Sequence, residues 1–225
     1  MGNQKKPAIQ SIAFPSSASF GRIVAKEKIL KQAGASAPVK KLFQEQVERI
    51  RCSHELTQDK LNLRSSRNVP KILIIQLFLK SSDWDTKILE TIDKAFGVPV
   101  LFELHLGGQL SYSSCYRRRS ESDASKWVFS SYFLSEWVDA EPREGSLPMS
   151  LDMDSLYDQL VRQLSPVSSD EPLAQLTERI DSTRKMEREM ERLKSRLKKE
   201  KQFNRKVEIN SEIRTLSAEL DRLNG

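Results

Sequence analysis

Two short acidic stretches are the parts of this chain whose spacing comes closest to a catalytic motif. Asp83 and Asp85 follow the most apolar run of the sequence, and Glu103-Leu104-His105 lies on the next expected strand. Metal-dependent nucleases of the restriction-enzyme type use carboxylates on neighbouring strands to hold the metal, and a lysine to assist the attacking water. Here a histidine occupies the lysine position. A divergent nuclease using Asp85 and Glu103 is therefore only a further alternative, and we assign no catalytic residue.

Other chemistries lack the residues that they require. The sequence contains no phosphate-binding loop, no dinucleotide-binding glycine motif and no nucleophile elbow. Cys52 and Cys115 lie far apart without a C-x-x-C motif, and His54 and His105 are the only histidines. Neither a zinc site nor a redox pair is predicted from such a set. We therefore expect no cofactor and no metal.

Changes in composition divide the chain into three parts. Residues 1–19 are polar and rich in serine, and we expect them to form a flexible lead-in. Residues 20–165 carry the patterns of strands and helices and are expected to form one sheet domain, which opens with a helix over 20–33. Residues 171–224 have helical spacing and many charges, which predicts a basic coiled-coil helix.

The sheet domain is predicted from its hydrophobic periodicity. The run over 69–80 is continuously apolar and β-branched, as expected for a strand that is buried on both faces. A helix over 85–96 and a strand over 98–106 then complete a βαβ crossover. Asp93 and the Arg117-Arg118-Arg119 run are interpreted as solvent-exposed charges. The expected fold class is α/β (α+β), a small mixed sheet with a βαβ crossover and packed helices, followed by a long C-terminal coiled-coil helix.

The C-terminal quarter carries two apolar seams at coiled-coil spacing. The first runs over 173–197 and the second over 209–223, with apolar residues three and four apart. Good helix formers between the seams favour one continuous helix. The alternative is an αα-hairpin that turns near Asn204, where neither seam continues in register. Because a small domain cannot cover so long a seam, the pattern predicts a homodimer or a coiled-coil hetero-partner.

Basic residues crowd the junction between the two seams. The common interpretation of such a run is a solvated face with charges paired at i, i+4 spacing. The functional alternative is non-specific, salt-dependent contact with nucleic-acid phosphates, made by Arg192, Lys194, Arg196, Lys198, Lys199, Lys201, Arg205 and Lys206. The same junction is our candidate surface for a protein partner, through Lys199, Glu200, Gln202, Phe203, Asn204, Val207 and Asn210.

Composition limits the cellular setting. The chain has 225 residues and a net charge of +6, which permits contact with nucleic acid without requiring it. No stretch approaches the roughly 20 apolar residues of a membrane span, and the first residues lack the apolar region of a signal peptide. The two free thiols suit a reducing compartment. We therefore expect a cytoplasmic protein without a membrane partner.

Three stretches together carry a family resemblance. They are the strand, loop and helix over Ile72–Phe96 with Pro99–Phe102, the segment Phe133–Trp137, and the most specific one, Lys199–Asn210. On these stretches the chain resembles a bacterial domain-of-unknown-function family, DUF4391, from about Phe20 onward. Proteins of this kind are similar to those encoded beside DNA methyltransferases and helicases in restriction-like or phage-defence loci.

The resemblance implies a function without implying a reaction. It points to a non-enzymatic adaptor or assembly subunit, with a DNA methyltransferase or helicase as the implied partner. The family provides no catalytic residues to carry over to this chain. A nucleic-acid-binding accessory protein remains the alternative, and Lys199–Asn210 is the segment where a shared partner contact is expected.

Overall fold

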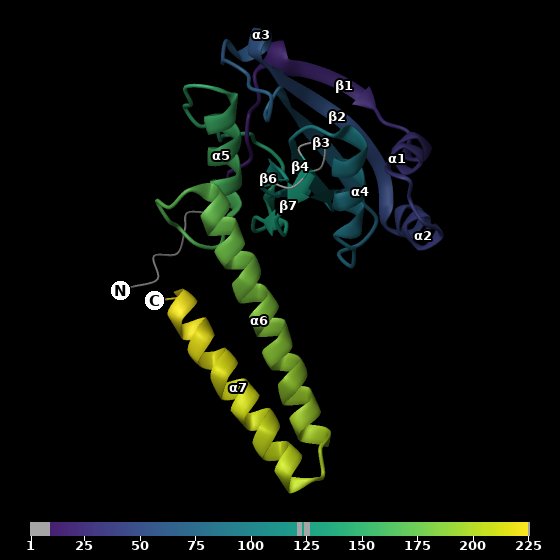
Figure 1. The fold of residues 1–225 in the computed structure, drawn as a ribbon. Coiled ribbons are helices and arrows are strands. Elements are labelled where there is room, and N and C mark those ends of the chain that lie inside the picture. The colour runs from purple at the N-terminus through teal and green to yellow at the C-terminus, as the bar shows by residue number, and fades with distance from the viewer. Residues whose placement is uncertain (1–9, 121–122, 124–126, 225) are drawn as a thin grey trace. The chain divides into compact units, whose positions relative to one another are not determined.

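The computed structural model describes residues 10–120, 123 and 127–224, and it divides into two compact units. The first ends at Ser168 and contains a mixed sheet with packed helices, and the second begins at Ser169 and is helical (Figure 1). The predicted fold class is confirmed.

The first unit contains nine strands and five α-helices in its described residues. The strands are β1 (Ser19–Ile23), β2 (Val47–Thr57), β3 (Lys71–Leu79), β4 (Val100–Leu106), β5 (Gln109–Ser114), β6 (Arg117–Arg119), β7 (Trp127–Phe129), β8 (Phe133–Leu134) and β9 (Val138–Asp139). The helices are α1 (Lys26–Ala33), α2 (Ala37–Gln46), α3 (Gln58–Leu61), α4 (Lys87–Phe96) and α5 (Met153–Leu164), and a 3-10 turn covers Ser16–Ala18.

The main sheet has the strand order β1-β2-β3-β4-β5-β8, and β9 also pairs with β5. Only β3 and β4 run parallel, and α4 connects them, so the predicted βαβ crossover is confirmed. The other neighbouring strands are antiparallel, while β6 and β7 form a separate ribbon. The apolar run around β3 therefore forms an internal strand of the sheet, as its composition predicts.

The predicted helix over 20–33 is wrong in its first part. Residues Ser19–Ile23 form the edge strand β1, and the helix begins only at Lys26. Gly21 has a φ of 67°, and the pairing register with β2 shifts between Ser19 and Arg22. A left-handed backbone at Gly21 interrupts a helix, and pairing with β2 supplies the hydrogen bonds that the helix would have supplied.

One face of the sheet carries the main apolar core. Ile75 and Leu77 from β3 and Phe102 from β4 are buried there with Ile88 and Ile92 from α4. Helices α1 and α2 pack over the same cluster, and Figure 1 shows α1, α2 and α4 gathered on one side of the sheet. The helix over 85–96 thus buries the apolar stripe that its spacing predicts.

The opposite face is organised around a buried carboxylate. Glu103 lies between Phe102 and Leu104 in β4 and so points away from the main core. Its side chain is fully buried. Arg143 Nη1 donates a hydrogen bond to its Oε1 at 2.7 Å, and Gln76 Nε2 donates to its Oε2 at 2.9 Å. A buried charge is tolerated only when it is paired and hydrogen-bonded in this way.

The same network fastens two irregular segments to the sheet. Arg143 Nη1 also donates to the carbonyl oxygen of Ile12 at 2.9 Å, and the Ile12 N–H donates to Tyr112 Oη at 2.7 Å. The N–H of Ala13 also donates to the carbonyl oxygen of Gly145, and the N–H of Gly145 donates to the carbonyl oxygen of Ser11. Residues 1–9 of the predicted lead-in lie outside the described residues, but Ile12 is 3% exposed and packs into the fold.

The electrostatics of Glu103 agree with this structural role. Burial alone raises the pKa of the carboxyl, but His105, whose Nε2 lies 3.8 Å away, together with Arg143 and Gln76, lowers it to about 2. The carboxylate is therefore charged over the physiological range. Its partner Arg143 is the group that compensates the charge most directly.

The second unit consists of two helices, α6 (Leu173–Lys199) and α7 (Phe203–Asn224), which pack against each other. The helical prediction for this region is confirmed, but the interpretation as one continuous helix is wrong. The chain leaves the helix at Glu200 and reverses, as in the hairpin alternative (Figure 1). Glu200 Oε1 accepts the N–H groups of Lys201 at 2.7 Å and Gln202 at 2.9 Å, so a side chain stabilises the turn without glycine or proline.

The two apolar seams cover each other within one chain. Leu193 and Ile209, which are equally far in sequence from Lys201, are both buried, and so are Ile180 and Leu220. Arg179 Nη1 also donates to the carbonyl oxygen of Leu223 at the open end of the hairpin. Because the seam is used internally, it no longer gives a reason to expect a homodimer.

We expect Arg143→Met to destabilise the first unit by about 3–5 kcal/mol, because it leaves the buried Glu103 carboxylate without its main partner. Urea unfolding at neutral pH measures this loss. The matched control is Arg67→Met at an exposed position, which should change stability by less than about 0.5 kcal/mol. Equal effects of the two substitutions would contradict the central role of the Glu103–Arg143 pair.

We also expect the full chain to be a monomer, because its apolar seams are buried within one hairpin. Light scattering across the micromolar range should give the mass of one chain, 25.8 kDa. Ile209→Asp, which places a charge in the seam, should lower the helical content measured by circular dichroism. A wild-type mass of two chains would show that the hairpin surface also self-associates.

Candidate functional site: the tip of the helical hairpin

The hairpin tip, residues 192–210, holds the net charge of the protein. This segment contains eight basic and two acidic residues and therefore has a net charge of +6, the same as the whole chain. The remaining residues carry equal numbers of acidic and basic side chains. The positive potential of the molecule thus originates at one end of the hairpin, where the turn brings the two ends of the segment together.

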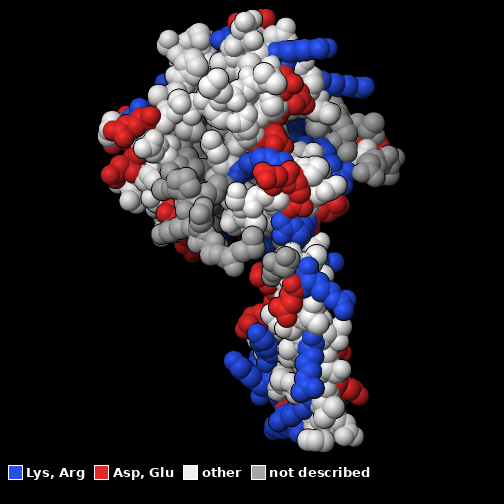
Figure 2. Space-filling model, turned by 90° about the vertical axis from the view of Figure 1, so that its left-hand side faces the viewer, with Lys and Arg blue, Asp and Glu red and all other residues white. Residues whose placement is uncertain are grey.

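The basic side chains of the tip point into solvent. Arg192 lies 3.5 Å from Glu189, an exposed pair of the kind that contributes little. No ion pair among the described residues involves the other seven basic side chains, which are all exposed: Lys194, Arg196, Lys198, Lys199, Lys201, Arg205 and Lys206. Figure 2 shows Lys and Arg side chains gathered along the hairpin. The interpretation of this run as a face of i, i+4 ion pairs is therefore not supported at the tip.

Two apolar side chains stand among these charges. Phe203 is 77% exposed and Val207 is 53% exposed. With Asn210 they occupy positions i, i+4 and i+7, which places them on one face of α7. Ile209 faces α6 within the buried seam instead. The exposed stripe of Phe203, Val207 and Asn210 is therefore separate from the seam that holds the hairpin together.

The structure brings the predicted partner-binding residues together at this tip. Lys199 ends α6, Glu200 and Gln202 lie in the turn, and the other four follow in the first two turns of α7, namely Phe203, Asn204, Val207 and Asn210. The carboxylate of Glu200 accepts hydrogen bonds from the backbone N–H groups of Gln202 and Lys201, and these bonds lower its pKa. The sequence-predicted nucleic-acid contacts lie on the same tip.

The residues of the nuclease alternative do not converge. Asp85 Oδ1 accepts the N–H of Lys87, the first residue of α4, at 2.8 Å, on the side of the sheet with the main core. Glu103 lies on the opposite face, where Arg143 binds it. Within the described part of the chain, no cluster of three or more His, Cys, Asp or Glu side chains is suited to a metal ion.

Two charged residues of the first unit are buried, contrary to their prediction as solvent-exposed charges. Asp93 and Arg117 were expected in solvent but are 2% and 4% exposed. Tyr132 Oη donates to Asp93 Oδ2, and Cys115 Sγ lies 3.6 Å from the same oxygen. Asp93 follows Leu89 by four residues, which places it on the apolar stripe of α4, and that spacing is the signal that predicts its burial.

Arg117 is the buried basic residue beside this cluster. Its Nη2 donates to the carbonyl oxygen of Gly97 at 2.9 Å, and its guanidinium lies 4.0 Å from the centre of the Trp127 ring. Burial raises the pKa of Asp93 to about 7, against the opposing effects of Tyr132 and Arg117. Burial also raises the pKa of Cys115, so its thiol is a poor nucleophile. The cluster holds α4 to the chain after β5.

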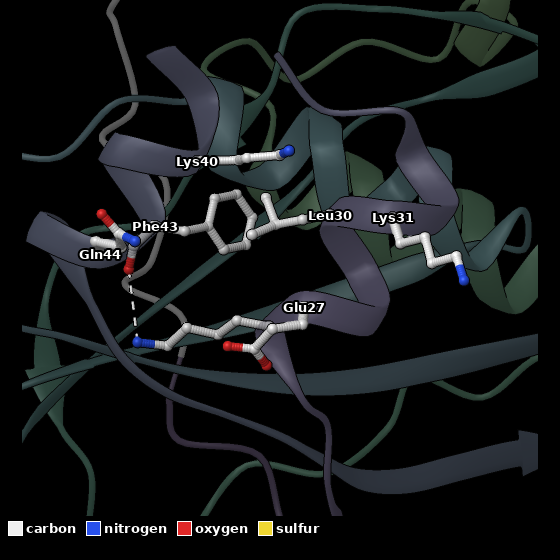
Figure 3. Close-up of a pocket in the computed structure, with 7 residues that line it drawn as sticks. Glu27, Leu30, Lys31, Lys40, Phe43 and Gln44 are labelled. Atoms are coloured by element: carbon white, nitrogen blue, oxygen red, sulfur yellow. Dashed lines mark hydrogen bonds between the residues drawn. The ribbon is translucent and has the colours of Figure 1, made fainter. Parts of the chain in front are cut away.

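A cavity of about 370 Å³ lies between α1 and α2 (Figure 3). Leu30 and Phe43 form its apolar wall, and the side chain of Lys31 points away from them. The Nζ of Lys26 donates to the backbone oxygens of Val47 at 2.5 Å and Phe43 at 3.5 Å. This lysine therefore binds the backbone, and the exposed side chains of Glu27, Lys31 and Lys40 also line the cavity.

These features define a class of protein: an α/β sheet unit that carries a helical hairpin with a basic, partly apolar tip. The chain belongs to the DUF4391 family, a domain of unknown function, whose family model matches residues 12–220. No curated protein and no solved structure matches the chain. Within the described residues, none of the helices has the length and apolar character needed to cross a membrane.

The buried Asp93 carboxyl predicts a stability that depends on pH. Its pKa is 3.8 without burial and about 7 in the fold, so the folded state binds more protons between these values. Stability therefore decreases as pH rises from about 4 to about 7, by up to about 1.4 kcal/mol per pH unit. Asp93→Asn should remove this slope in urea unfolding, whereas Asn at the exposed Asp59 should not. A slope unchanged in Asp93→Asn would contradict the assignment.

Proposed function

We propose that this protein is a non-enzymatic adaptor or assembly subunit that docks a protein partner through its hairpin tip. One observation carries the proposal. The hairpin tip has the same net charge as the whole chain, and the exposed side chains of Phe203 and Val207 lie at that same tip. Apolar side chains that share one exposed face and are surrounded by polar residues mark interaction sites, whereas singly scattered ones do not. Binding energy in such sites is concentrated in a few apolar anchors within a polar rim.

The rest of the molecule supports a role in binding rather than in chemistry. The buried carboxylates Glu103 and Asp93 are both engaged with side chains that hold the fold together. The apolar seam of the hairpin is used within the chain, which favours a hetero-partner over a second copy. In this proposal the sheet unit is the scaffold of the adaptor, and the hairpin is the part that binds the partner.

The family resemblance supplies the setting of this proposal. We place the protein in the cytoplasm of a bacterium, in a restriction-like or phage-defence locus, with a DNA methyltransferase or helicase as its partner. Both partner classes act on DNA, so a basic arm suits an assembly that forms on or near nucleic acid.

Co-expression with a DNA methyltransferase or a helicase encoded beside its gene tests the proposal. We expect one of them to co-elute with the full chain as a stable complex in size-exclusion chromatography. Failure to form a complex with either product would contradict the adaptor function. Magnesium-dependent DNA cleavage by the purified chain that is lost in Glu103→Gln would replace it with the nuclease alternative.

A further inference from the structure

The exposed stripe of α7 has the spacing of a helix that docks into a groove. Phe203, Val207 and Asn210 follow one another at i, i+4 and i+7 on one face, and the first two are 77% and 53% exposed. Helices that bind grooves on other proteins use apolar anchors at this spacing, and here the first two positions are apolar while Asn210 is polar. A side chain as large as Phe203 gains most from a pocket that removes it fully from water.

The basic residues around the stripe indicate which charge the rim of such a groove carries. Lys201, Arg205 and Lys206 flank Phe203 in sequence, and Lys198 and Lys199 end the facing helix α6. All five are exposed, and none takes part in an ion pair found among the described residues. Charge complementarity therefore requires carboxylates around the groove that receives the stripe.

Other occupants fit these observations less well. A second copy of the tip would bring two segments of net charge +6 together, and like charges repel. Nucleic-acid phosphates would account for the lysines but not for the aliphatic Val207, and no second aromatic residue lies in the tip for base stacking. Two apolar side chains are also a narrow face for a membrane-surface helix.

We infer that the partner of this tip is a protein with an apolar groove rimmed by carboxylates. Phe203 and Val207 fill the groove, and Asn210 lies at its end. The lysines and arginines of the turn pair with the rim and speed association. This inference rests on the proposed function and adds the chemistry of the partner's binding site.

The experiment measures the dissociation constant between the full chain and the methyltransferase or helicase that co-elutes with it. We expect Phe203→Ala to weaken binding by about 10- to 100-fold, as expected for a central anchor. Phe203→Leu should stay within about threefold of the wild type, because a groove accepts either apolar side chain. Because Phe203 is exposed, both variants should unfold at the wild-type temperature.

Charge reversal tests the rim separately. Lys201→Glu with Lys206→Glu should slow association by about tenfold at low salt and reduce its dependence on salt. Lys185→Glu with Arg188→Glu is the matched control, because it makes the same change of charge at exposed positions of α6 away from the tip. Leu151→Ala is the control for Phe203→Ala, since Leu151 is 93% exposed in the first unit.

The outcomes separate the two proposals. A complex that forms but is unaffected by both tip variants would overturn this inference and leave the adaptor function intact. The absence of any complex, combined with tip-dependent binding of duplex DNA or of phosphatidylglycerol vesicles, would overturn both. Loss of DNA binding in Phe203→Leu as well as in Phe203→Ala would identify base stacking in place of a groove.

Discussion

The sheet unit depends on the ion pair between Glu103 and Arg143. An ionised carboxylate in the middle of a sheet is costly to bury, and the fold compensates with a guanidinium and an amide from two other segments. Because Arg143 and Tyr112 also bind Ile12, the same charge holds the N-terminal segment and the loop around residue 143. One buried charge thus determines where two irregular segments lie, and its pKa of about 2 keeps it ionised.

The hairpin rests on a different constraint, the need to cover an apolar seam. Reversal of the chain at Glu200 lets α6 and α7 cover each other's apolar residues. That reversal also gathers the basic residues on either side of the turn at one end and leaves Phe203 and Val207 exposed. The proposed docking surface is therefore a consequence of how the seam is closed, since a continuous helix would spread the same charges along its length.

Much of the fold and of the candidate site could be predicted from local pattern. The strand around β3, the crossover through α4 and the residues of the tip follow from periodicity and charge. The burial of Arg117 could not be placed in this way, because it depends on Trp127, which follows later in the chain, whereas the spacing of Asp93 from Leu89 does indicate its burial. The edge strand β1 was also missed, because its hydrogen bonds come from pairing with β2.

The sequence by itself determined the fold class, the position of the apolar seams and the concentration of positive charge near residue 200. Each of these is a property of neighbouring residues, so local spacing specifies it. Only the tertiary structure decided that the seams close on one another, that Phe203 stays outside them and that Glu103 is paired with Arg143. Those outcomes depend on contacts between distant segments, whose energies decide among alternatives that have the same local pattern.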